Sequence, residues 1–306
     1  MKYKYFVTVL CAGLVAVMFL VTSSLQAANL NSALNHLPAD DEWSIMAHAA
    51  EGSKVGHSYL RSRLDSNTPT DYEKRILAIT AIGENPRTFG QENFIAKLES
   101  FFDGSQIGDP SLLNDDIFGL LALRSAGIDN QMTDKLYDYI RSNQNSDGGW
   151  GFATTVGSDT NTTAMAIAAL KTVGSEPNSA IAYLKKAQQP NGGFGYTPQT
   201  ASDGASTAWV ISGFIAARQP VPANAKAYLE SLQLSSGMFK WHSNDSSGSR
   251  LVTSYAVIAL SNNTLPIRIL NSTPAPSPSP TPAPVPSPTP VLANNAECVG
   301  IQAPSP

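Results

Sequence analysis

The stretch Gln144-Asn-Ser-Asp-Gly-Gly-Trp-Gly-Phe152 is written a second time, 44 residues later, as Gln188-Gln-Pro-Asn-Gly-Gly-Phe-Gly-Tyr196. Between the two copies lie a run of small and apolar residues at 160–174 and an amphipathic segment at 181–187. A repeat of this length is typical of arrays in which each unit is a pair of helices. The sequence therefore predicts a helical repeat protein.

Two kinds of helix alternate along the chain. Helices rich in small apolar residues are predicted at 71–83, 114–127, 161–174, 206–218 and 251–260, and amphipathic helices at 92–102, 132–143, 179–189 and 223–233. Gly83, Gly127 and Gly174 are expected to stop the first three apolar helices, because glycine adopts the left-handed conformation at little cost. Residues 164–170 are apolar all round, so that helix must be covered on two sides. A closed ring satisfies this requirement, with apolar helices inside and amphipathic helices outside. With one more pair at 43–64, the sequence predicts an all-α fold, an α/α toroid of five to six helix hairpins.

The repeated phrase suggests a structural role for its residues. The glutamine ends an outer helix, and we expect its amide to bind the free carbonyls of the last turn. The paired glycines permit a sharp turn, and the aromatic residue then fills the space between repeats. A third copy, Gln233 to Phe239, is interpreted as having Ser236 in place of the first glycine. The residues assigned to this structural motif are Gln144, Gly148, Gly149, Trp150, Gln188, Gly192, Gly193 and Phe194.

The N-terminus has the pattern of a secretory signal peptide. A basic start precedes an apolar run at 5–21 and a short polar segment, and a cut after Ala27 gives a signal peptide at 1–27. The alternative is an uncleaved membrane anchor, which would be the only contact with a membrane. We expect the protein to be secreted, extracellular or associated with the cell envelope.

The rest of the chain divides into a folded part and a tail. We assign the toroid to residues 40–268, a linker rich in Pro, Ser and Thr to 269–292, and a disordered tail to 293–306. The linker should be an extended spacer, because a proline-rich segment has too few donors and apolar groups to pack. After processing, Cys298 is the single cysteine, so no internal disulfide is expected.

Charge excludes some classes of partner. The formal net charge of −4 is spread along the chain, and Lys and Arg form no basic stripe. We therefore expect neither nucleic-acid binding nor a surface that binds anionic lipid.

The repeats resemble those of the terpenoid cyclase and protein prenyltransferase superfamily, whose fold is an α/α toroid. The resemblance covers roughly residues 40–265 and is carried by the copies at 144–152 and 188–196. Within that superfamily the chain is similar to secreted bacterial prenyltransferase-like proteins. Residues 159–170, Asp-Thr-Asn-Thr-Thr-Ala-Met-Ala-Ile-Ala-Ala-Leu, are also similar to the helical domain of cobalamin carriers of the transcobalamin type. The resemblance implies the fold and leaves the function open, because one fold serves both catalysts and binders.

The resemblance suggests two activities, and each needs residues that can be looked for in this sequence. Protein prenyltransferases hold zinc with Asp, Cys and His, but this toroid has no Cys, and His48, His57 and His242 are not spaced as ligands. We predict no metal site. Class II terpene cyclases use an Asp-x-Asp-Asp motif, and Leu-Asn-Asp-Asp at 113–116 supplies only its last two acids.

By that correspondence Asp115 would be the proton donor and Asp116 its partner, in a pocket that keeps a carboxylic acid neutral. The alternative that we favour is helix capping, because Asp and Asn are preferred at helix N-termini. Other inner helices begin in the same way. The helix starts should share one mouth of the ring, where Asp71, Glu73, Asp115, Asp116 and Asp159 would form an acidic rim, with Lys74 and Arg75 as possible ion-pair partners.

Aromatic residues suggest a third type of site. Phe118, Trp209 and Tyr255 each lie a few residues into an inner helix, and with Trp43 and Trp241 they could line a central pocket. An isoprenoid or a corrinoid would be a suitable ligand for such a pocket, although packing is the commoner role of aromatic residues in helices. No cofactor is predicted.

These observations lead to two hypotheses. The first is a non-catalytic toroid that binds a bulky, partly apolar small molecule or a cell-surface protein at its mouth, with ligand-binding candidates Asp71, Glu73, Asp159, Phe118, Trp209 and Tyr255. The second is a cyclase-like or prenyltransferase-like enzyme that uses Asp115 and Asp116 as acids.

Overall fold

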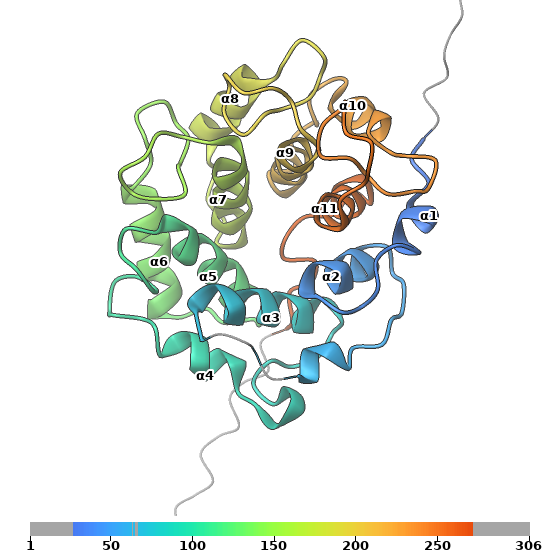
Figure 1. Ribbon diagram of the computed structural model, residues 1–306. Helices are drawn as coiled ribbons and strands as arrows, with labels where there is room; N and C mark the ends of the chain where they lie inside the picture. The colour runs from blue at the N-terminus through green and yellow to red at the C-terminus, as the bar shows by residue number, and fades with distance from the viewer. Residues whose placement is uncertain (1–26, 63, 65–66, 272–306) are drawn as a thin grey trace, which may run out of the picture. The chain divides into compact units, whose positions relative to one another are not determined.

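The helices form a ring with an inner and an outer layer (Figure 1). The computed structural model describes residues 27–62, 64 and 67–271. Residues 1–26 of the predicted signal peptide, residues 272–292 of the predicted linker, and the tail with Cys298 lie outside them. The inner helices are α2 (Glu42–Ala50), α3 (Pro69–Ala81), α5 (Leu113–Ser125), α7 (Thr160–Thr172), α9 (Gly204–Ala216) and α11 (Arg250–Leu260). The outer helices are α1 (Leu30–Leu34), α4 (Phe94–Glu99), α6 (Gln131–Ser142), α8 (Asn178–Ala187) and α10 (Ala225–Ser231), with short 3₁₀ turns at Tyr59–Arg61 and Phe89–Gln91.

The inner helices close on one another. Each packs against the next in the order α2, α3, α5, α7, α9 and α11, and α11 packs against α2. The seven residues 164–170 of α7 are each at most 2% exposed, as expected for a helix that is covered on two sides. The predicted all-α toroid is confirmed.

The predicted helices match the structure to within a few residues, apart from the first pair. The segment 43–64 supplies α2, but after it only the 3₁₀ turn Tyr59–Arg61. The outer position beside α11 is taken by α1, from the beginning of the described chain. At the other boundaries Gly83, Gly127 and Gly174 have φ of 86°, 73° and 77°, so these glycines stop inner helices as predicted.

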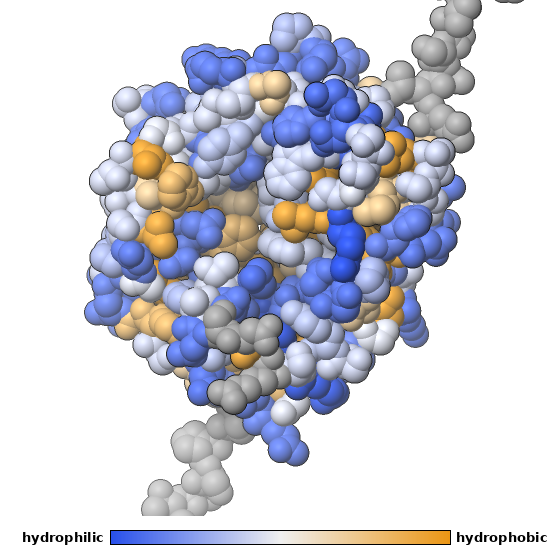
Figure 2. Space-filling view, viewed as in Figure 1, coloured by the Kyte–Doolittle hydropathy of each residue, from blue (hydrophilic) through white to orange (hydrophobic). Residues whose placement is uncertain are grey.

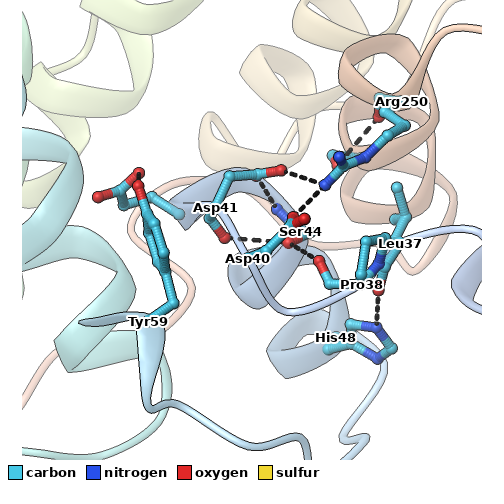
Figure 3. Close-up of polar contacts among 10 residues, drawn as sticks. Leu37, Pro38, Asp40, Asp41, Ser44, His48, Tyr59 and Arg250 are labelled. Atoms are coloured by element: carbon cyan, nitrogen blue, oxygen red, sulfur yellow. Dashed lines mark hydrogen bonds and ion pairs between the residues drawn. The ribbon is translucent and has the colours of Figure 1, made fainter. Parts of the chain in front are cut away.

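The two ends of the array are joined by polar contacts (Figure 3). Arg250, at the start of α11, forms an ion pair with Asp40 and donates to Asp41 Oδ2 (2.7 Å). The loop before α2 is fixed in turn, because Ser44 Oγ donates to the Pro38 carbonyl (2.6 Å) and His48 Nε2 lies 2.8 Å from the Leu37 carbonyl. The ring is therefore closed through side chains about 210 positions apart in the sequence.

The motif glutamines link neighbouring repeats. Each amide donates to the carbonyl of the first glycine of its own turn and to an oxygen near the start of the next outer helix. The two acceptors are Gly148 O and Ser179 Oγ for Gln144 (2.7 and 3.0 Å), Gly192 O and Ala223 O for Gln188 (2.8 and 2.7 Å), and Gly237 O and Asn29 O for Gln233 (2.9 and 2.9 Å). The prediction that these amides bind the carbonyls of their own last helical turn is wrong, because each side chain points forward into the turn that follows.

The third copy of the motif keeps its first glycine. Gly237 has φ of 104°, close to the 91° of Gly148 and the 88° of Gly192, and it stands four residues after its glutamine as they do. The residue that replaces a glycine is Met238, not Ser236, so our alignment of this copy was wrong by one position.

The motif aromatics wedge between repeats, as predicted. Trp150 and Phe194 are 1% and 0% exposed. The backbone N–H of Trp150 donates to Thr163 Oγ1 of the following inner helix (2.9 Å), and the same bond recurs in the other two copies. A Cβ at Gly193 would lie 2.5 Å from a ring carbon of Tyr228, which explains why this turn uses glycine. None of the described helices has the length and apolar character of a membrane span.

Candidate functional site at the mouth of the ring

A pocket of about 250 Å³ opens where the first two turns of the inner helices meet. Figure 2 shows a hollow at the centre of the ring with apolar surface inside it. Most of the lining side chains come from the second or the sixth residue of an inner helix, which lie one turn apart on one face. The lining residues are Trp43, Thr70, Lys74, Asn114, Phe118, Asn161, Thr162, Met165, Trp209 and Tyr255.

Four aromatic side chains form the apolar part of this pocket. The ring of Trp43 lies 5.0 Å from Tyr255, 5.7 Å from Trp209 and 6.5 Å from Phe118, in edge-to-face geometry. Trp209 and Tyr255 are 4.5 Å apart. The structure thus brings Phe118, Trp209 and Tyr255 together, as the sequence suggested. Trp241 lies outside the cluster and is 38% exposed.

Polar side chains make the other wall, and the sequence had not assigned them to a pocket. Thr70, Lys74, Asn114 and Asn161 are partly exposed there. Lys74 Nζ lies 3.4 Å from the Asp71 carboxylate, as foreseen for this pair, whereas Arg75 forms its ion pair with another acid, Glu42. The sequence alone could have indicated these pocket residues, because the second and sixth residues of every inner helix share one face.

Three carboxyl groups gather in the seam between α3 and α5, away from the pocket lining. Glu73 and Asp116 are fully buried, and Asp115 is 6% exposed. Thr70 Oγ1 donates to Asp115 Oδ1 (3.2 Å), and the backbone N–H of Ile107 donates to Asp116 Oδ1 (2.9 Å). Asp116 Oδ2 and both Glu73 oxygens have no hydrogen-bond partner within the described residues.

Burial favours the neutral form of these acids. Desolvation raises the pKa of Asp116 to about 7, and the neighbouring Asp115 acts in the same direction. Desolvation, followed by the charges of Asp115 and Asp116, raises the pKa of Glu73 well above its ordinary value. Desolvation also raises the pKa of Asp115, against the hydrogen bond from Thr70.

The position of these acids corrects two predictions. The capping interpretation is wrong for Asp115 and Asp116, because the cap residue of α5 is Leu112 and the two carboxyls bind Thr70 and the loop at 106–109 instead. The acidic rim is also absent as an exposed surface, since Glu73, Asp115 and Asp116 are buried in the seam. Asp115 borders a separate, more open depression of about 760 Å³ between the start of α3 and the loop before α5.

Asp159 and Asp71 have local structural roles. Asp159 caps α7 by accepting from the Thr162 N–H (2.7 Å), and it also accepts from the Tyr196 hydroxyl (3.1 Å). It is 2% exposed, and burial raises its pKa. Asp71 lies in the first turn of α3, where Thr68 is the cap residue. Neither carboxyl lines the central pocket.

The three histidines considered as zinc ligands lie in different surroundings. His48 is bonded to the Leu37 carbonyl, His57 lies beside Phe89, and His242 lies beside Asp245. Within residues 27–62, 64 and 67–271, no three His, Cys, Asp or Glu side chains are arranged to hold a metal ion.

Comparisons with known proteins bear on this architecture. A sequence profile described as the squalene-hopene cyclase N-terminal domain matches residues 119–190, and one described as the prenyltransferase alpha-alpha toroid domain matches residues 176–267. A search of curated proteins found no match. Neither profile describes a cobalamin carrier, so the predicted likeness to those carriers gains no support from them.

Two solved structures share most of the fold. Candida albicans protein geranylgeranyltransferase-I complexed with GGPP is similar at 13% identity, with a TM-score of 0.58 over 81% of this chain and 97% of that chain. A variant of the type II terpene cyclase MstE from Scytonema, in complex with geranylgeranyl dihydroxybenzoate, is similar at 14% identity, with a TM-score of 0.54 over 76% of this chain and 95% of that chain. At these identities the likeness establishes the fold and not an activity. The two profile matches, which together cover residues 119–267, support the resemblance to the terpenoid cyclase and protein prenyltransferase superfamily of α/α toroids.

Proposed function

We propose that this toroid is a binding protein that takes the apolar part of a small amphiphilic ligand into its mouth pocket. The observation that carries the proposal is the pocket itself, with four aromatic rings on one side and Lys74, Asn114 and Asn161 on the other. Ligand sites are typically apolar clefts with a few convergent polar groups that fix orientation.

The size of the pocket limits what can enter. Its volume of about 250 Å³ lies just below the range of roughly 300–1,000 Å³ that is common for drug-sized ligands. One ring system or one end of a longer apolar chain fits this volume, while the rest of the ligand stays at the mouth. A ligand with an anionic or hydrogen-bonding group next to its apolar end would suit the ammonium of Lys74 and the two amides.

Binding is favoured over acid catalysis by where the carboxyls lie. A general acid must come within about 2.6–3.2 Å of the atom that it protonates. Asp115 and Asp116 contact the loop at 106–109 and are not part of the pocket wall. Export of the protein also belongs to this proposal, and it rests on the N-terminal sequence pattern. Mass spectrometry of secreted material tests it, with Ala28 as the expected first residue.

Intrinsic fluorescence offers a direct binding assay, because Trp43 and Trp209 stand in the pocket. We expect naphthalenesulfonate, which fits best by size, and geranylgeraniol to quench this signal in a saturable way, whereas cyanocobalamin is too large for the pocket. The Asn114→Trp variant should block the pocket and weaken binding at least tenfold. Asn178→Trp, at an exposed outer position, is the matched control and should bind as the wild type does. Equal binding by both variants, or no binding of any probe, contradicts the proposal.

One observation favours the enzyme alternative: burial raises the pKa of Asp116 to about 7, so that a large share of this carboxyl is protonated at neutral pH. A cyclase acid needs this property. Incubation with geranylgeranyl substrates, followed by product analysis, tests it. A cyclised product that is lost in Asp115→Asn would replace the binding proposal with an enzymatic one.

A further inference from the structure

Three exposed aromatic residues occupy equivalent positions in the three copies of the motif. Phe152, Tyr196 and Trp241 each stand eight residues after the motif glutamine, and they are 46%, 41% and 38% exposed. In the described part of the chain, the only other large apolar residue with such exposure is Ile269. Exposed aromatics that recur with a structural repeat indicate a surface with a function. We call Phe152, Tyr196 and Trp241 the aromatic arc.

Backbone contacts fix the arc beside the mouth of the ring. The carbonyl of each aromatic residue accepts from an N–H at the start of the preceding inner helix. The pairs are Phe152 with Asn114 of α5 (3.2 Å), Tyr196 with Thr160 of α7 (2.9 Å), and Trp241 with Gly204 of α9 (2.7 Å). Successive members are therefore set apart by about the spacing of packed helices, roughly 8–10 Å. The arc follows half of the mouth, next to the pocket that Asn114 lines.

Two of the three loops that carry the arc are polar and free of charged residues, while the third contains Asp245 and is bonded by Lys240. Residues 152–158 and 196–202 contain Thr, Ser, Gln and Gly but no Asp, Glu, Lys or Arg. In the third loop, His242 lies 3.8 Å from Asp245. Hydroxyl and amide groups both donate and accept hydrogen bonds, so they match other hydroxyl groups well.

We infer that the aromatic arc binds a neutral glycan chain across consecutive repeats. A sugar ring has flat faces of C–H bonds, which pack on aromatic rings, and a rim of hydroxyls, which bond to Thr, Ser and Gln side chains. A polymer of identical units also suits a platform whose aromatic residues recur at one spacing.

Other occupants fit these observations less well. Membrane-surface binding by an amphipathic element draws on Lys and Arg beside aromatic and aliphatic residues, and two of the three loops have neither cation. A folded protein partner would match this spacing only if its own surface repeated at the same interval. The arc is separate from the mouth pocket, so it can bind a glycan whether or not the pocket takes an amphiphile.

Retention by insoluble neutral polysaccharides, and affinity electrophoresis in their soluble forms, tests this inference. A panel of β-glucan, α-glucan, xylan and mannan covers the common geometries. We expect the full chain to be retained by at least one of them. Loss of one aromatic ring should weaken retention about fivefold, as expected for a contact of about 1 kcal/mol.

Three variants and two controls identify the surface. Phe152→Ala and Trp241→Ala should each weaken retention, and the double variant should weaken it more than twentyfold. Tyr196→Phe should be retained as the wild type is, because the aromatic ring is kept. The substitution removes only the hydroxyl that donates to the Asp159 carboxylate. The pocket variant Lys74→Ala, on a helix that anchors no member of the arc, should keep glycan retention, so the arc and the mouth pocket can be assessed separately.

Thermal denaturation of each variant confirms that it is folded. Failure of every neutral glycan to retain the wild type overturns the inference, as does equal retention of the double variant. Binding to phosphatidylcholine vesicles that is lost in the double variant, without glycan retention, would assign the arc to a membrane surface instead.

Discussion

Replacing Asp116 with asparagine should remove much of the pH dependence of stability in this toroid. The Asp116 side chain is fully buried, and desolvation raises its pKa from an ordinary 3.8 to about 7. A carboxyl whose pKa is raised by folding binds its proton more tightly in the native state. The free energy of unfolding therefore falls as pH rises from about 4 to about 7, and it is constant above that range.

The size of the effect follows from the pKa difference of about 3 units. Each unit corresponds to about 1.4 kcal/mol, so deprotonation costs the native state on the order of 4 kcal/mol. For a domain of this size, 1 kcal/mol shifts Tm by about 2–4 °C. At pH 4.5 the unfolded carboxyl is already mostly ionised, so about 3 kcal/mol of this cost falls between pH 4.5 and pH 8, and wild-type protein should lose roughly 6–12 °C in Tm over that range. The raised pKa values of Glu73 and Asp115 act in the same direction.

Asparagine is a suitable replacement because it keeps the one hydrogen bond that the structure gives the side chain. Its Oδ1 can accept from the Ile107 N–H, and its Nδ2 replaces Asp116 Oδ2, which has no partner within the described residues. We expect Asp116→Asn to be about as stable as the wild type at pH 4.5 and more stable at pH 8.

The assay is thermal or urea denaturation at constant ionic strength, every half unit from pH 4.5 to 8.5. Asp138→Asn, at an exposed site on α6, is the control and should follow the wild-type curve. A wild type that is equally stable at both ends of the range refutes the reasoning, as does a variant with the wild-type slope.

Three further predictions concern stability and are checked by urea denaturation. Gln188→Ala removes two hydrogen bonds that link repeats and should cost about 1–3 kcal/mol, whereas exposed Gln199→Ala should cost less than about 0.5 kcal/mol. Gly193→Ala should cost about 1–3 kcal/mol because its Cβ would lie 2.5 Å from a tyrosine ring, while Gly157→Ala has no atom within 4 Å and should be neutral. Arg75→Ala removes the ion-pair partner of the buried Glu42 carboxylate and should lower the free energy of unfolding by about 3–5 kcal/mol. Arg75→Lys should recover part of that loss. A neutral Gln188→Ala, equal effects of the two glycine variants, or a tolerated Arg75→Ala would each contradict the structure.

The sequence predicted the ring because the ring depends on local patterns. Helices that are apolar on all sides, glycines that stop them and a repeated turn can each be read from a few neighbouring residues. Gly83, Gly127 and Gly174 were placed correctly on this basis. The partner of α11 could not be read in the same way, because it is α1, from the other end of the chain.

The site was predicted only in part, because its composition depends on the rotation of each inner helix. Phe118, Trp209 and Tyr255 were grouped correctly, since all three are large and lie about six residues into a helix. Glu73 was expected at the mouth because it lies near a helix start. It stands one residue before Lys74, and one residue is a rotation of about 100° around the helix axis. That rotation turns its carboxyl out of the pocket and into the seam, where a loop covers it.

The same rotation separates binding from acid chemistry within one helical turn. In α5 the pocket is lined by Asn114 and Phe118, one turn apart, while Asp115 and Asp116 lie between them on other faces. An acid at position 114 or position 118 would meet a ligand in the pocket directly. This chain places an amide and an aromatic ring there, and its buried carboxyls pack against the loop at 106–109. The pocket therefore has the groups to hold an apolar end and its polar neighbour, whereas the buried acids affect how stability varies with pH.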